Sequence, residues 1–174
     1  RLVSRLRKAL PEGLIEGQPG GYRLTVEPDA VDAVRFERLV AQARDAEGPR
    51  RVQLLREALA LWRGAAMADV GLEDSEALDA AVTRLERLRL AALEDRFDAE
   101  VGLGPAGELI AELTDLVAAH PMRERLAAAL MRALAAAGRD TEALLVYERT
   151  RETLADQLGA DPSPELSALH VALL

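Results

Sequence analysis

One segment, residues 138–166, constrains the fold most, because it encodes one helix, its end and the start of the next. We predict the first helix over 140–158. Asp140 or Thr141 is expected to cap it, since their side-chain oxygens can accept the N–H groups that a first helical turn leaves unsatisfied. Apolar residues then recur at helical spacing on one face. They are Ala143, Leu144, Tyr147, Leu154 and Leu158.

The end of this helix and the next start are also encoded. Gly159 is the residue that most readily adopts the left-handed conformation that stops a helix. Ser163 is placed to cap a second helix, Pro164 suits its first position, and Glu165 lies near the positive end of the helix dipole. We therefore predict a second helix over 164–174, and a short loop makes the two helices antiparallel neighbours.

The rest of the chain beyond Pro28 also has helical periodicity. Its breaks contain Gly or Pro, and a weak 34-residue repeat relates Gly104 to Gly138 and Glu108 to Glu142, although the full tetratricopeptide consensus is absent. The predicted fold is mainly all-α, with tetratricopeptide-like helical hairpins and about seven helices. The five further helices are expected over 30–46, 49–61, 75–101, 106–119 and 122–137.

The first 26 residues have a different character. Residues 1–9 alternate apolar and basic side chains, as in the last turns of an amphipathic helix, and residues 14–16 and 22–26 flank a Gly-rich turn typical of a β-hairpin. A basic helix followed by a hairpin is how a winged helix-turn-helix ends. An ordinary basic helix with an incidental hairpin is the alternative. We therefore divide the chain into residues 1–26 and 27–174.

Charge separates the same two parts. Residues 1–26 have a net charge of +3, and the remaining residues sum to −11 within the total of −8. DNA would thus be attracted to the amino-terminal part and repelled by the rest. The chain has no Cys, which excludes disulfides and thiolate metal sites, and no apolar run approaches the roughly 18 residues of a membrane span. With neither a start Met nor a signal peptide, it is expected to be an excised part of a cytoplasmic protein.

The parts of an enzyme site are missing from the sequence. His120 and His170 lack Cys partners and a second His at metal spacing, so structural roles are expected for both, with His120 before a capped helix start. The glycine clusters at 17–21 and 102–107 lack the Lys-Ser/Thr of a phosphate loop. No cofactor is expected. A group of carboxylates is interpreted as solvated helix surface; it comprises Glu73, Asp74, Glu76 and Asp79.

Two aromatic residues could be interpreted as binding residues. Trp62 has apolar neighbours at helical spacing, which favours packing in the core over a ligand site. Tyr147 is interpreted in the same way, with its hydroxyl at the rim.

Several motifs together resemble a known family. Residues 3–10 and 19–24 resemble the end of the recognition helix and the wing of response-regulator-type DNA-binding domains. The helical part resembles the bacterial transcriptional activator domain of Streptomyces antibiotic regulatory proteins. The motifs that carry this second resemblance occur in order over residues 54–64, 120–126, 130–134 and 138–166.

The resemblance implies a transcription activator of secondary-metabolite genes. Its winged helix would bind direct repeats in promoter DNA, while its helical domain would help to engage RNA polymerase and support a possible homodimer. By match to the family, Arg5 and Arg7 would face the DNA, Ser4 and Lys8 would contact its backbone, and Arg23 would contact phosphate from the wing.

Two expectations qualify this interpretation. Because the leading part of the winged helix is missing, the chain by itself is expected to bind DNA weakly or not at all. The rival interpretation is a tetratricopeptide-like scaffold that binds proteins and regulates an attached module, with residues 1–26 as a linker.

Overall fold

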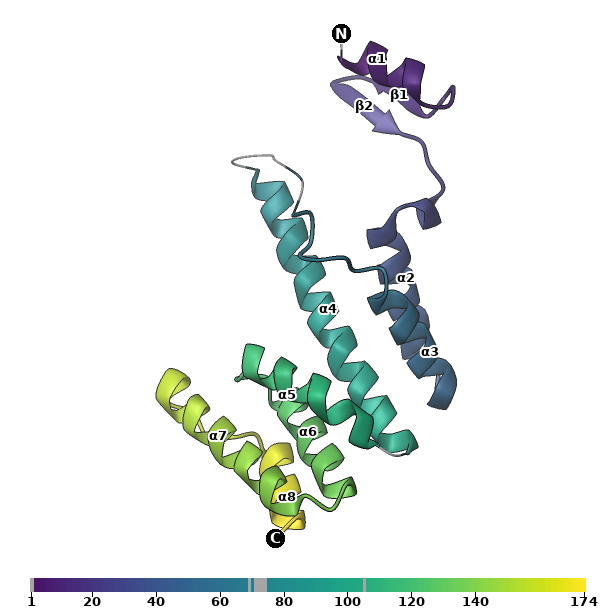
Figure 1. Ribbon diagram of the computed structural model, residues 1–174. Coiled ribbons are helices and arrows are strands. Elements are labelled where there is room, and N and C mark those ends of the chain that lie inside the picture. Colours follow the sequence, from purple (N-terminus) through teal and green to yellow (C-terminus); the bar gives the residue numbers. More distant parts are fainter. Residues whose placement is uncertain (1, 69, 71–74, 105) are drawn as a thin grey trace.

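A computed structural model describes residues 2–68, 70, 75–104 and 106–174. It is mainly helical, with one antiparallel β-hairpin near the amino terminus (Figure 1). The hairpin consists of β1 (Ile15–Gln18) and β2 (Gly21–Leu24), and two 3₁₀ helices are η1 (Pro28–Ala30) and η2 (Ala106–Leu109). The α-helices are α1 (Leu2–Ala9), α2 (Asp32–Arg44), α3 (Gly48–Leu59), α4 (Glu76–Leu103), α5 (Ile110–Ala119), α6 (Glu124–Ala136), α7 (Asp140–Leu158) and α8 (Pro164–Ala172).

The predicted end of α7 and start of α8 are confirmed. Gly159 has φ of 62°, which is left-handed, and it follows the last residue of α7. Ser163 is the N-cap of α8, where its Oγ accepts a hydrogen bond from the backbone N–H of Leu166 at 3.3 Å. The backbone N–H of Ser163 in turn donates to the carboxylate of Glu124 at 2.6 Å, so the loop before α8 is tied to the start of α6.

The predicted cap of α7 is wrong. Arg139 occupies the N-cap position without a side-chain cap bond, and Asp140 and Thr141 are already helical. The cause is the tight connection from α6, in which Gly138 has φ of 72° and the N–H of Arg139 donates back to the carbonyl of Leu134. Helix α7 therefore begins one residue earlier than a side-chain cap from Asp140 would require.

Three other helix starts differ from the prediction. Val31 has an extended backbone, so the predicted helix over 30–46 is divided into η1 and α2. The helix predicted over 106–119 is divided into η2 and α5. Helix α6 begins at Glu124 rather than at 122, and its N-cap, Arg123, makes no side-chain cap bond, so the cap expected after His120 is absent at this start.

The long helix α4 connects two hydrophobic cores. Its 28 residues extend over about 42 Å at 1.5 Å per residue, and Figure 1 shows α2 and α3 on one side of it and the later helices near its end. The first core contains Phe36, Leu39, Val40, Ala43, Leu54, Leu55, Ala58, Leu85 and Ala92. The second contains Phe97, Leu113, Leu126, Leu130, Met131, Leu134, Tyr147 and Leu166 with smaller alanines.

Ion pairs reinforce both contacts of α4. The buried carboxylate of Glu100 accepts a hydrogen bond from Arg56 of α3 at 2.6 Å, and this bond raises the pKa of Arg56. Towards α6, Arg125 donates to Asp95 at 2.7 Å and to Asp98 at 2.6 Å. Burial opposes the charge of Arg125, but these hydrogen bonds outweigh it and raise its pKa. Both α3 and α6 are thus fixed to the second half of α4 by ionic as well as apolar contacts.

None of the described helices is both long enough and apolar enough to cross a membrane.

Candidate functional site

The basic face of α1 is the first candidate site. Successive residues of a helix are rotated by about 100°, so Ser4, Arg5 and Lys8 lie within one arc of α1. All three side chains are exposed, and Ser4 lies on the same side of the helix as Lys8. The two cations are therefore available to a polyanion on one side of the helix. Figure 1 shows α1 and the hairpin together, beyond the start of α2.

Arg7 has a different position from the other basic residues of α1. Its Nε donates a hydrogen bond to the carbonyl oxygen of Ile15 at 3.1 Å, and its guanidinium lies 5.6 Å from the centre of the Tyr22 ring. Ile15 belongs to β1 and Tyr22 to β2. Arg7 therefore joins the helix to both strands of the hairpin.

Arg23 lies on the hairpin rather than on the helix. In the register of the two strands it is opposite Glu16, and its side chain is exposed. The hairpin is shorter than predicted, since β2 ends at Leu24. The structure thus places Ser4, Arg5 and Lys8 on the helix, Arg23 on the second strand and Arg7 between them.

Large apolar side chains around this unit are uncovered. Leu6 is 47% exposed, Tyr22 63% and Leu24 56%, whereas Val3 is half-buried. The side chain of Leu2 and the residue Arg1 lie outside the described residues. Several exposed large apolar side chains on one small unit are typical of a surface that packs against further protein.

The histidines and the carboxylate group of the helical part lie at helix ends, in packing contacts or on the exposed surface. His120 ends α5, and the ring of His170 stacks on that of the buried Tyr147, with 3.9 Å between centroids. Glu76 and Asp79 are exposed in the first turn of α4, while Glu73 and Asp74 lie outside the described residues. Within the described residues, no cluster of His, Asp and Glu could hold a metal ion.

Trp62 packs on its neighbours and also borders a cavity. Its ring meets that of the buried Phe36 edge to face at 5.2 Å, and the guanidinium of Arg89 lies 4.6 Å from its centre. The expected packing of Trp62 is therefore confirmed, but another part of its side chain borders the cavity. The cavity beside it has a volume of about 540 Å³. Sequence reasoning did not find this cavity, because α2, the segment after α3 and α4 each supply part of its wall.

Comparison with known proteins gives a consistent result. Residues 31–174 match the model of a family described as the bacterial transcriptional activator domain. Regulatory protein AfsR of Streptomyces griseus is 42% identical over 176 residues, which cover 99% of this chain and 18% of AfsR. Transcriptional regulator RedD of Streptomyces coelicolor is 39% identical, with 99% of this chain and 52% of RedD covered.

A solved structure has the same fold. Mycobacterium tuberculosis EmbR in complex with low affinity phosphopeptide superposes with a TM-score of 0.86 at 34% identity, covering 98% of this chain and 47% of the EmbR chain. The similarity thus includes the amino-terminal helix and hairpin as well as the helical part. The chain spans 18% to 52% of the length of the two regulators above, so each of these relatives contains much that has no counterpart here.

Proposed function

We propose, given that the chain belongs to the bacterial transcriptional activator domain family of Streptomyces antibiotic regulatory proteins, that residues 27–174 are the effector domain of a DNA-binding transcriptional activator. The observation that carries the proposal is the similarity to such regulators over 99% of the chain, from the basic helix to α8. Membership in a family of transcriptional regulators also agrees with the expectation that this region is not an enzyme.

The amino-terminal unit is proposed to be the carboxyl-terminal part of a winged helix, with residues 1–26 as its extent. Arg5 would contact base edges, Ser4 and Lys8 the DNA backbone, and Arg23 a phosphate beside the wing. The exposed apolar surface of the unit supports this proposal, because further strands and helices would cover it. We assign Arg7 to positioning the wing against the helix, since its hydrogen bond to β1 already directs its guanidinium to the hairpin.

The helical body is proposed to act through protein contacts. Its net charge of −11 opposes contact with DNA, so its part in activation would be to support assembly of the regulator on direct repeats and to engage RNA polymerase. A homodimer is one form that this assembly could take. The rival function is a protein-binding scaffold for an attached module. The helical hairpins suit both functions equally, but a scaffold function gives no reason for the basic face of α1.

A fluorescence-anisotropy titration of labelled promoter DNA at several salt concentrations tests the DNA-binding part. It compares this chain with a version extended upstream to complete the winged helix. We expect specific binding by the extended chain only, lost in Arg5→Ala and retained in Arg44→Ala, which removes an exposed arginine of the acidic body. Equal effects of the two variants, or tight sequence-specific binding by the present chain, would contradict the proposal.

A further inference from the structure

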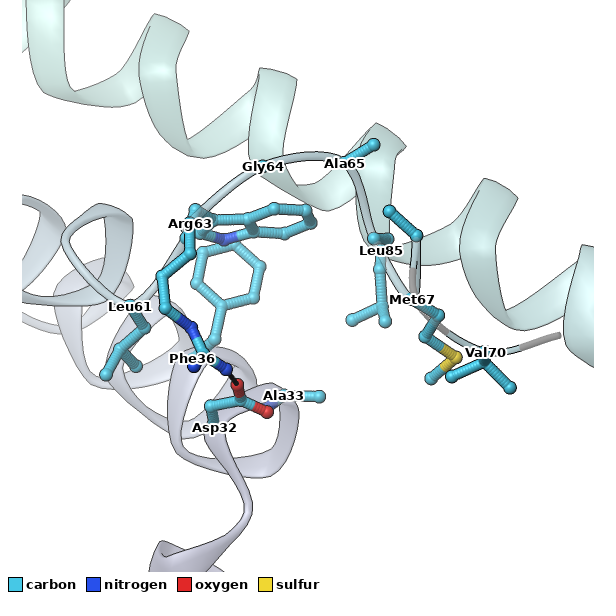
Figure 2. A pocket seen from close by; sticks show the side chains of 13 residues that line it. Asp32, Ala33, Phe36, Leu61, Arg63, Gly64, Ala65, Met67, Val70 and Leu85 are labelled. Atoms are coloured by element: carbon cyan, nitrogen blue, oxygen red, sulfur yellow. Dashed lines mark hydrogen bonds and ion pairs between the residues drawn. The ribbon is translucent and has the colours of Figure 1, made fainter.

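The cavity beside Trp62 lies between three separate elements. Its walls come from the first turns of α2, from the segment that follows α3, and from α4 (Figure 2). Phe36 and Leu61 lie on one side in Figure 2, and Leu85, Met67 and Val70 lie on the other. Its volume of about 540 Å³ falls within the range of about 300–1,000 Å³ that is usual for small-molecule sites.

The side chains of the wall are mainly aromatic, aliphatic and thioether groups. The Trp62 ring, which packs on the buried Phe36, offers an aromatic surface, and Met67 offers a polarisable sulfur that packs well against aromatic rings. Val70 completes the exposed apolar wall, and the buried Leu85 lies behind it. Met67 and Val70 are 37% and 42% exposed, so part of each apolar side chain faces the open side of the cavity. Filling the cavity with a planar aromatic body would cover them.

The wall is held in place before any ligand enters. The backbone N–H of Ala66 donates to the carboxylate of Glu86 on α4 at 2.8 Å, and Arg89 donates to the carbonyl of Gly64 at 3.3 Å. Met67 has φ of 52°, a conformation that non-glycine residues rarely adopt and that needs support from surrounding structure. Such preorganisation lowers the entropic cost of binding.

One ion pair lies among the residues of this apolar wall. Arg63 donates through one terminal nitrogen to Asp32 at 3.2 Å, while the other carboxylate oxygen of Asp32 accepts the N–H of Ala33 at 2.8 Å. Within the described residues Asp32 is the recorded partner of Arg63, whose side chain is 86% exposed. A guanidinium has five N–H donors, so it can bind an anionic group in addition to Asp32.

We propose that this cavity binds a small planar aromatic molecule that carries a carboxylate or phenolate. The ring system lies between Trp62 on one side and Met67 and Val70 on the other. The anionic group accepts hydrogen bonds from Arg63. Because Arg63 pairs with Asp32, the first residue of α2, and Leu85 belongs to the first half of α4, such a ligand would connect the segment after α3 with both helices.

The chain contains one Trp, which lies in the wall of the proposed site. Its indole N–H therefore gives a single, unambiguous cross-peak in a ¹H–¹⁵N correlation spectrum. The probe is 2-naphthoate, titrated into the ¹⁵N-labelled chain, with 2-naphthamide as its uncharged counterpart. We expect saturable shifts of the Trp62 indole and of backbone amides near Met67 and Val70, with naphthoate bound more tightly than naphthamide.

Variants separate the two halves of the proposed site. Arg63→Gln should weaken naphthoate about fivefold, as expected for the loss of one exposed charge-assisted hydrogen bond, and leave naphthamide unchanged. Ala33→Phe should reduce the binding of both probes by occupying the cavity, with circular dichroism used to verify its fold. Arg44→Gln is the matched control, because it removes an exposed arginine at the far end of α2.

Three results would overturn the proposal. These are no saturable shift at Trp62 with naphthoate, shifts spread over both cores, or equal affinity of Arg63→Gln and the unaltered chain for naphthoate. Shifts at Trp62 that follow protein concentration and not naphthoate would assign the cavity to a second copy of the chain, which also contradicts a small-molecule site.

Discussion

Helix α4 should make the two hydrophobic cores unfold as one unit, and Phe97→Ala tests this. Phe97 is fully buried in the second core, in the second half of α4, where Arg56 of α3 also pairs with Glu100. Replacing it with Ala removes a large buried side chain and leaves a cavity, at a cost of about 3–5 kcal/mol. With a urea m value of about 2 kcal/mol/M, the unfolding midpoint should fall by about 1.5–2.5 M.

The assay follows urea unfolding by two signals. Far-ultraviolet circular dichroism reports helices in both cores, whereas the fluorescence of Trp62 reports the first core, against which its ring packs. If α4 couples the cores, Phe97→Ala lowers both midpoints equally although Trp62 lies in the other core. Leu145→Ala, at a position 49% exposed on α7, is the control and should change stability by less than about 0.5 kcal/mol.

Two outcomes would refute this reasoning. One is a Trp62 midpoint that stays in place while the circular dichroism transition becomes biphasic, which would mean that the second core unfolds alone. The other is a change in Phe97→Ala no larger than that in the surface control, which would mean that the residue is not buried as described.

Further predictions concern local contacts. Ser163→Ala removes the cap of α8 and should cost about 1 kcal/mol in thermal or urea unfolding, whereas Ser163→Asn, which can cap, should cost less. The hydrogen bond from Arg139 lowers the pKa of Glu142 below its ordinary 4.5. The small contribution of this pair to folding stability is therefore present above pH 4.5 and is lost as the pH falls through the lowered pKa of the folded state. Arg139→Ala should raise this pKa in a carboxyl NMR titration; an unchanged value would refute the contact. Arg7→Ala should accelerate hydrogen exchange in the hairpin, whereas Arg5→Ala should not.

Much of the fold could be predicted from local patterns. The bounds of α7 follow from apolar spacing and the left-handed Gly159, and the start of α8 follows from Ser163 and Pro164. The cap of α7 could not be predicted, because the tight turn at Gly138 decided where that helix begins. The split of the helix predicted over 30–46 depends on the extended backbone of Val31, a conformation that β-branched residues favour but that one Val within a helical pattern does not predict.

The candidate sites depended more on tertiary contacts. Clustered basic residues predict that α1 carries a basic face, but only the structure shows that Arg7 bonds to β1 while Arg5 remains exposed. The surroundings of Trp62 could likewise be predicted only in part. Its apolar neighbours predict packing, whereas the cavity requires Phe36 and Leu85, which are 26 and 23 residues away along the chain.

Residues 27–174 are proposed to supply activation, while the winged helix supplies DNA binding. The most direct measurement is transcription in vitro with purified RNA polymerase from a promoter that carries the direct repeats. It compares the upstream-extended protein with the same protein ended after residue 26. We predict that the shortened protein still binds the promoter but no longer increases the transcript. Equal activation by both proteins at equal promoter occupancy would contradict the account.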